Sequence, residues 1–152
     1  MSNATLTPAE QLRADLTRIG ASAFTATDYK PSTIKHVVLL RFAPQVSEAQ
    51  KIETQAGFLA LQSTATRNGK PYIISIEAGQ QHSGEGVDQQ FEQVYIVTFK
   101  SEGDRNFYVG QPIVDDAQYY DPVHQTFKDW VGPLLHQQPL GVLVVDFTVT
   151  GS

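Results

Sequence analysis

Four segments of the chain alternate apolar and polar residues with a period of two, which is the pattern of a β-strand that buries one face. These segments are residues 34–42, 72–78, 91–99 and 142–149. In the first segment, between Pro31 and Pro44, every second residue from Ile34 onward is apolar except His36. The alternation therefore predicts that this histidine lies on the core-facing side of a strand.

Apolar residues spaced three and four apart, after residues that cap helices, predict four helices. They are expected at residues 8–19, 48–65, 101–109 and from Pro122 onward. A Thr-Pro sequence opens the first helix, which ends before Gly20, and Asp121 caps the last. The side of the second helix that should face the core carries Ile52, Ala56, Leu59 and Ala60.

The predicted elements follow the order β-α-β-β-α-α-β after the extra N-terminal helix. This order is typical of the ferredoxin-like α+β fold, in which a four-stranded antiparallel sheet has its helices on one face. We expect residues 34–150 to form this domain and residues 1–33 to form an extension with one helix. The extension is expected to be a lid, a dimer arm or a helix packed peripherally on the surface.

The outward side of the predicted strands is also apolar, and a single layer of helices cannot cover both sides of a sheet. Its apolar residues are Val37, Leu39, Ile73, Ile96, Val145 and Phe147. A large exposed apolar face is a feature of protein interfaces. We therefore predict a homodimer in which two copies pack sheet against sheet through this face.

The composition narrows the choice of partners and compartment. The 152 residues carry a net charge of −5 with both signs interspersed, so no basic patch favours nucleic acid. The absence of cysteine excludes disulfides and thiol catalysis and fits a reducing compartment. The longest apolar runs, residues 37–40 and 142–145, are far shorter than a membrane span, and no signal peptide is recognisable. We therefore expect a cytoplasmic protein that binds neither nucleic acid nor membranes.

Asp146 interrupts an otherwise apolar strand, and a carboxylate there needs a partner because burying it alone costs several kcal/mol. His124, near the start of the last helix, is the partner that we predict, and Asp146 would fix its tautomer and raise its basicity. The alternatives are a carboxylate bonded to backbone, tyrosine or arginine, and a solvent-facing imidazole. His36 is either a hydrogen-bonded core residue or a member of the same site.

Several other chemistries lack their sequence patterns. The sequence has no His-Glu-x-x-His motif, paired histidines or acidic calcium loop, so no metal site is expected. It has neither a Gly-x-Ser-x-Gly motif nor a cysteine nucleophile. Gly84-Glu85-Gly86 lacks the third glycine and the following helix of a dinucleotide-binding loop. We therefore expect no cofactor.

Five short motifs in order resemble the stress-responsive dimeric α/β-barrel (Dabb) family. They are the first predicted strand, Ser83-Gly84-Glu85-Gly86, residues 97–102, Asp121-Pro122-Val123-His124 with Phe127, and residues 144–147. Each motif is short, and their shared order carries the resemblance. It extends over about residues 33–149 and implies a dimeric ferredoxin-like barrel.

The resemblance also implies site residues, because the family includes a plant polyketide cyclase that uses acid–base residues in a pocket between sheet and helices. Its catalytic positions correspond to His36, Tyr108, His124 and Asp146, and its third-strand histidine corresponds to Gln93. Tyr108 is the closest match to the cyclase tyrosine, whereas an alignment without a gap puts Gln118 in that position. The expected ligand-binding residues are Val38, Leu40, Gln93, Tyr95, Val97 and Val144. Relative to the cyclase, residues 113–120 are an insertion.

Three functions are compatible with the sequence. The first is binding of a small aromatic or polyketide-like molecule in the pocket between sheet and helices. The second is cofactor-free acid–base catalysis on a carbonyl substrate, as in a cyclase or lyase, with His124 as the base, and Tyr108 or His36 bonded to the enolate. The third is a non-catalytic structural oligomer. The sequence alone leaves open whether the protein is an enzyme.

Overall fold

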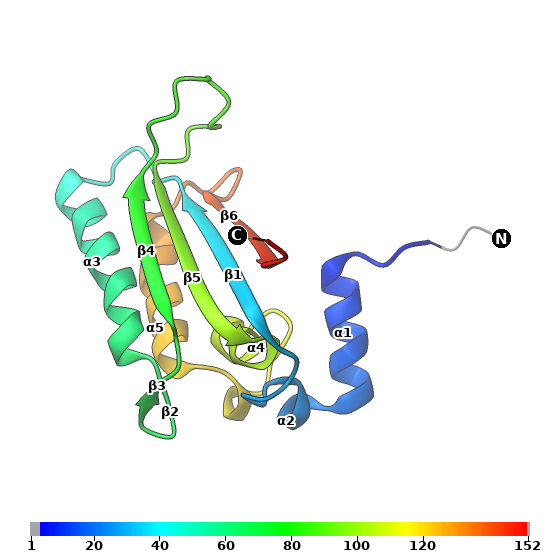
Figure 1. Cartoon of the computed structure of the whole chain (residues 1–152). Helices are drawn as coiled ribbons and strands as arrows, with labels where there is room; N and C mark the ends of the chain where they lie inside the picture. Colours follow the sequence, from blue (N-terminus) through cyan, green and yellow to red (C-terminus); the bar gives the residue numbers. More distant parts are fainter. Residues whose placement is uncertain (1–3, 152) are drawn as a thin grey trace.

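A four-stranded antiparallel sheet forms the centre of the structure, a computed structural model that describes residues 4–151 (Figure 1). Its strands are β1 (Pro31–Leu40), β4 (Ser75–Gln80), β5 (Gln93–Ser101) and β6 (Val142–Thr148). They lie in the order β4-β5-β1-β6, and each neighbouring pair is antiparallel. The predicted α+β fold with a four-stranded antiparallel sheet is therefore confirmed.

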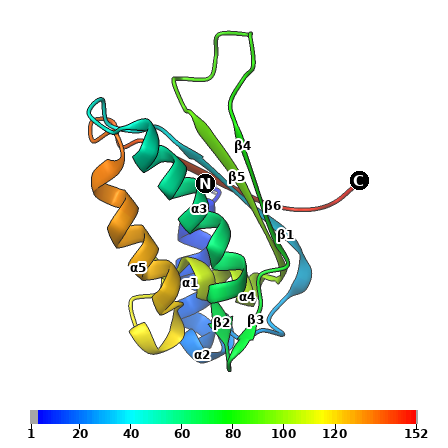
Figure 2. The ribbon, with the colours of Figure 1, turned by 90° about the vertical axis from the view of Figure 1, so that its left-hand side faces the viewer.

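Three helices lie on one side of the sheet (Figure 2). They are α3 (Glu48–Thr64), α4 (Glu102–Val109) and α5 (Pro122–Val131). Each begins where a side chain accepts a hydrogen bond from a backbone N–H of the first turn, and these caps are Ser47, Ser101 and Asp121. Short elements between them are β2 (Thr66–Arg67), β3 (Lys70–Pro71) and η1 (Ala117–Tyr119), and η2 (Gly132–Leu134) follows α5. Within residues 4–151, no helix has the length and apolar composition needed to cross a membrane.

The hydrophobic core lies between this side of the sheet and the helices. Phe58 of α3 stacks on Tyr95 of β5, with 3.9 Å between the ring centroids. The prediction that Ile52 and Leu59 face the core is wrong, because they are 71% and 37% exposed. The buried side of α3 instead carries Thr54, Phe58 and Leu61. The large apolar area of the Phe58 ring explains why this side of the helix is buried.

The other face of the sheet has no helix over it within the described residues, and it exposes apolar side chains. Leu143, Val145 and Phe147 of β6 are 37%, 53% and 50% exposed. Ile73, which was predicted on this face, is buried in the core. The prediction failed because β4 begins only at Ser75, so strand alternation does not apply to Ile73.

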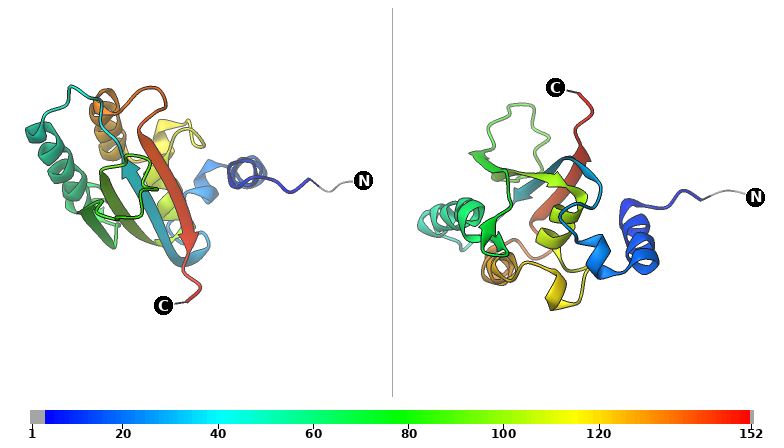
Figure 3. Two further views of the ribbon diagram at one scale, coloured as in Figure 1. Left: turned by 90° about the horizontal axis from the view of Figure 1, so that it is seen from above. Right: turned by 60° about the horizontal axis from the view of Figure 1, so that its bottom comes forward.

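The N-terminal extension contains two helices, α1 (Pro8–Ile19) and α2 (Ala21–Phe24). Figure 3 shows α1 at the β6 side of the molecule, apart from α3 and α5. The segment after α1, which was predicted to be a linker, includes α2 and buries Phe24. The carbonyls of Tyr29 and Lys30 accept hydrogen bonds from the first N–H groups of α4, so this segment packs on the domain.

Candidate functional site

Two adjoining cavities lie on the helix side of β1 and β6. The first, which we call the inner cavity, has a volume of about 530 Å³ and lies between the sheet and α5. Its walls are mostly apolar and include Val38, Leu40, Phe58, Phe127, Val131, Leu135, Val142 and Val144. Its polar side chains are His36, Gln111, His124 and Lys128.

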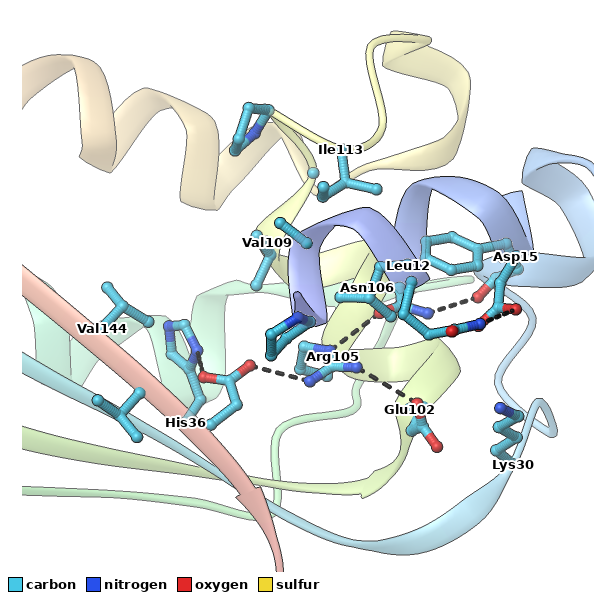
Figure 4. Close-up of a pocket in the computed structure, with 18 residues that line it drawn as sticks. Leu12, Asp15, Lys30, His36, Glu102, Arg105, Asn106, Val109, Ile113 and Val144 are labelled. Atoms are coloured by element: carbon cyan, nitrogen blue, oxygen red, sulfur yellow. Dashed lines mark hydrogen bonds and ion pairs between the residues drawn. The ribbon is translucent and has the colours of Figure 1, made fainter. Parts of the chain in front are cut away.

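The second cavity, which we call the outer cavity, has a volume of about 660 Å³ and lies between α1, α4 and β6 (Figure 4). The N-terminal extension supplies part of its wall, including Leu12 and Asp15 of α1. Both cavities have His36, Val109, Pro112 and Val144 in their linings. His36 therefore lies where the two cavities meet.

The strand register brings His36 and Asp146 together. The two residues are directly opposite in the antiparallel pair β1–β6, so their side chains project from the same face. His36 Nδ1 lies 2.7 Å from Asp146 Oδ1, and Arg105 Nη1 of α4 donates to Asp146 Oδ2 at 2.9 Å (Figure 4). Burial raises the pKa of Asp146, but the hydrogen bonds and charges of His36 and Arg105 outweigh burial and leave this pKa below its usual range.

These contacts define the protonation pattern of the cluster. Asp146 is ionised, so Nδ1–H of His36 donates to the carboxylate, and Nε2 is the remaining acceptor of a neutral ring. Arg105 is itself fixed, because its Nε donates to Asn106 Oδ1 at 2.9 Å. The Asn106 amide donates to the carbonyl of Phe24 at 2.9 Å. The extension thus helps to position the guanidinium that holds Asp146.

His124 has a different environment on α5. Asp121 caps this helix by accepting hydrogen bonds from the backbone N–H groups of Val123 and His124. The His124 ring lies with Nδ1 2.5 Å from the carbonyl oxygen of Tyr108, so Nδ1–H donates to it. Burial lowers the pKa of His124 to about 3, because the hydrogen bond to Tyr108 only partly offsets the loss of solvation. His124 is therefore neutral at neutral pH, with Nε2 as an acceptor.

Tyr108 lies between the two histidines. Its ring stacks on that of His124 with 3.7 Å between centroids, and it meets the His36 ring edge-on at 5.6 Å. Burial raises the pKa of Tyr108, so the phenol is un-ionised at neutral pH. Its hydroxyl is buried without a hydrogen-bond partner among the described residues. Tyr108 lies outside the linings of both cavities, so its hydroxyl is a donor buried in the core.

The predicted hydrogen bond between Asp146 and His124 is wrong. Asp146 bonds to His36 and Arg105, whereas His124 bonds to the backbone carbonyl of Tyr108. The sequence predicted both residues in one site, but the pairing depends on strand register, which places His36 opposite Asp146. The four predicted catalytic residues still lie near one another, in two separate hydrogen-bonded groups.

The predicted ligand-binding residues fall into two sets. Val38, Leu40 and Val144 line the inner cavity. Gln93, Tyr95 and Val97 lie outside the linings of both cavities and are buried in the core. The Tyr95 hydroxyl donates to Gln93 Oε1 at 2.5 Å, and Gln93 Nε2 donates to the carbonyl of Lys51 at 3.0 Å. These polar groups thus bond to one another and to the backbone.

Two residues of the site were not identified from the sequence. Arg105 had no recognisable signal, because its partner Asp146 is 41 residues away and the two meet only in the folded chain. Lys128 did have a recognisable signal in the sequence, because it follows His124 by four residues on a predicted helix. Residues with this spacing share one helix face, so a cavity that contains His124 should also contain Lys128.

The fold and the cavities define a ferredoxin-like α+β domain whose sheet and helices enclose space for a small molecule. Residues 34–149 match the family described as "Stress responsive A/B Barrel Domain", abbreviated Dabb. The chain therefore belongs to the Dabb family, and the resemblance seen in the sequence is confirmed. No curated protein matches the chain.

Several solved structures share this fold. A hydroxynitrile lyase from Passiflora edulis has a TM-score of 0.62 and 20% identity, over 80% of this chain and 97% of that one. A protein from Arabidopsis thaliana has a TM-score of 0.62 and 23% identity, over 78% of this chain and 97% of that one. A dimeric ferredoxin-like protein of unknown function from Jannaschia sp. has a TM-score of 0.58 and 18% identity, over 77% of this chain and 99% of that one. At these identities the likeness shows the fold alone.

Proposed function

We propose that this protein binds a small, largely apolar molecule, aromatic or polyketide-like, in the inner cavity. The observation that carries the proposal is the cavity itself, which has a volume of about 530 Å³, mostly apolar walls and two buried histidines. Pockets for small molecules commonly have volumes of about 300–1,000 Å³, with apolar walls and a few oriented polar groups.

The polar groups favour a ligand that carries hydroxyl or carbonyl oxygens. His124 is a neutral ring whose Nε2 accepts a hydrogen bond, which suits a ligand hydroxyl. Gln111 also lines the cavity, and its side-chain amide is the corresponding donor for a ligand oxygen. A phenol or a hydroxyketone combines both groups on an apolar body.

The test is to block the inner cavity without disturbing the core. Leu140 lines this cavity and is 54% exposed, so Leu140→Trp adds bulk at little cost to folding. Leu6→Trp is the matched control, because Leu6 is 49% exposed and lies outside both linings. In a calorimetric screen of phenols and aromatic hydroxyketones, Leu140→Trp should weaken binding at least tenfold and Leu6→Trp should leave it unchanged. Equal binding by all three proteins would place the ligand elsewhere.

A second candidate function is cofactor-free acid–base catalysis by a lyase. The observation that favours it is the hydrogen-bonded series His36–Asp146–Arg105, in which a fixed carboxylate orients an imidazole and stabilises its protonated form. His124 is a weaker candidate for the base because its pKa of about 3 lies far from neutral pH. The likeness of the fold to a hydroxynitrile lyase is compatible with this reaction class.

The lyase step can be written for a hydroxynitrile. His36 Nε2 takes the hydroxyl proton, the oxygen forms a carbonyl, and the bond to the nitrile carbon breaks with its electron pair on cyanide. The protonated His36, stabilised by Asp146, then returns the proton to cyanide. No oxidant, reductant or cofactor is needed, because one bond is cleaved and one proton is moved.

Release of aldehyde from an aromatic hydroxynitrile tests this second candidate. His36→Gln should lower kcat/KM about 100-fold or more, which is the usual scale for loss of a general base. His82→Gln is the control, because His82 is exposed. No turnover by the unmodified protein would reject the lyase and leave ligand binding as the function.

We also propose a homodimer that forms through the bare sheet face. Leu143, Val145 and Phe147 expose a continuous apolar strip along β6, and the Jannaschia protein of the same fold is dimeric. Phe147→Asp should convert the dimer to a monomer in sedimentation at micromolar concentration. Ile52→Asp on the exposed side of α3 is the control and should leave the dimer intact. A monomeric unmodified protein would reject this interface.

A further inference from the structure

The described residues that line the inner cavity include a cationic side chain but no carboxylate. Its lining, as far as the structure describes the chain, includes neither aspartate nor glutamate and has one lysine, Lys128. The two histidines of the lining contribute no negative charge in any protonation state. The inner cavity is therefore an apolar space with a single formal charge, and that charge is positive.

Lys128 is bonded only to neutral acceptors. Its Nζ donates to the carbonyl oxygens of Val109 at 2.9 Å and Gln111 at 3.0 Å. Three other partly buried cations of the described chain each bond to a carboxylate, in the pairs Lys51–Glu92, Arg67–Asp104 and Arg105–Asp146. An ammonium has three N–H groups, so two carbonyls leave one N–H of Lys128 for a further partner.

Burial makes this position costly for a charge. Loss of solvation lowers the pKa of Lys128, and the neighbouring Asp129 only partly opposes the effect. A partly buried cation gains most from a partner of opposite charge, because the Coulomb attraction is stronger where water is excluded. Within residues 4–151 no carboxylate forms an ion pair with Lys128.

We propose that the ligand of the inner cavity is an organic anion whose carboxylate bonds to Lys128. This inference rests on the proposed function and names the class of ligand that the cavity selects. Lys128 and His124 are four residues apart on α5 and both line the cavity. Their Cβ atoms are therefore about 5–6 Å apart, the usual distance for this spacing.

The spacing sets the shape of the ligand. A carboxylate at Lys128 places a second oxygen group, at a distance of about one helical turn, beside Nε2 of His124. A hydroxyl suits that second position, because Nε2 of the neutral ring accepts a hydrogen bond. A small aromatic hydroxy acid has both groups on a rigid apolar body, and 4-hydroxybenzoate is the simplest probe of this kind.

The experiment compares 4-hydroxybenzoate with 4-hydroxybenzamide, which has nearly the same shape without the charge. Calorimetry at pH 7 and low salt should give a dissociation constant about tenfold lower for the carboxylate, since charge-assisted hydrogen bonds are roughly twice as strong as neutral ones. Lys128→Met should bring the ratio close to one and change amide binding little. Lys128→Arg should keep the preference, and Lys100→Met is the control because Lys100 is exposed.

A salt titration of the unmodified protein provides a measurement that needs no folded variant. Raising the ionic strength should weaken binding of the carboxylate but not of the amide. The inference is overturned if both probes bind equally, if Lys128→Met keeps the tenfold preference, or if neither probe binds. Binding of the amide alone would reject an anionic ligand but would support the proposal that the inner cavity binds a small molecule. The Leu140→Trp comparison tests separately whether the ligand binds in the inner cavity.

Discussion

The two buried histidines of the site show how the surroundings of one side chain decide its chemistry. His36 and His124 are 5% and 7% exposed, and each uses Nδ1 in a hydrogen bond. The partner of His36 is a carboxylate held by an arginine, so a proton gained by this ring is balanced by a negative charge. The partner of His124 is a neutral carbonyl, so a proton gained there is unbalanced. The two rings therefore differ in their partners, and His124, kept neutral by burial, is suited to accept a hydrogen bond.

The largest expected effect comes from removing the carboxylate that distinguishes His36. Asp146→Ala leaves Arg105, which is 8% exposed, with only the more distant Glu102 as an ionic partner. We expect the free energy of unfolding to fall by about 3 kcal/mol, the lower end for a broken buried pair, because Asp146 is partly exposed. Urea denaturation measures this change in the free energy of unfolding. Glu77→Ala, at an exposed carboxylate, should change it by less than about 0.5 kcal/mol.

An intermediate effect is expected from pH, because the folded state opposes protonation of His124. The pKa of His124 is about 3 in the folded state and about 6.5 when unfolded, so the unfolded chain binds more protons between these values. Stability must then fall as the pH drops below 6.5, by about 1.4 kcal/mol at pH 5.5.

Denaturation of the unmodified protein and of His124→Asn, at pH 7.5 and pH 5.5, measures this contribution. The difference between the two proteins should shrink by about 1.4 kcal/mol at the lower pH. Asp146 acts in a separate range, because its lowered pKa adds stability that is present above its ordinary pKa and is lost only as the pH falls below about 4. An unchanged difference at pH 5.5 would show that His124 is protonated readily in the folded state.

The smallest effect is expected at the tyrosine between the histidines. Tyr108→Phe removes a buried hydroxyl that has no partner within residues 4–151, so stability should stay within about 1 kcal/mol of the original value or rise. Tyr72→Phe is the matched comparison, because the Tyr72 hydroxyl donates to Asp121 at 2.5 Å. That change should cost about 1.5–3 kcal/mol, as for a hydrogen bond to a charged group. Equal losses in the two variants would mean that the Tyr108 hydroxyl is bonded in the free protein.

Much of the fold could be predicted from local patterns. Strand alternation placed His36, Val38 and Leu40 on one buried face, and capping residues located the starts of α3, α4 and α5. These features depend on residues close together in the sequence. The buried side of α3 could not be predicted this way, because it depends on the stacking of Phe58 against Tyr95, which belongs to a distant strand.

The site could be predicted only in part, for a related reason. The sequence identified the three polar residues that need partners, His36, His124 and Asp146, and two of them, His36 and Asp146, bond to each other. It did not identify which of them pair. The pairing depends on the register of β1 with β6 and on the position of Arg105 in α4. A single change of register would place Asp146 on the opposite face of the sheet.

The path of the chain between α2 and β1 limits how far the protein can be shortened. A Cβ at Gly103 would lie 1.7 Å from the carbonyl oxygen of Ala26, so this strip of backbone rests directly on the first turn of α4. Proteolytic trimming as far as Gly20 should therefore leave a stable remnant. Removal of Phe24 as well should expose α4 and free the side chain of Arg105, which holds Asp146 of β6 in place. A fusion partner should accordingly be attached ahead of α1, and domain boundaries drawn at residue 34 should yield an impaired fragment.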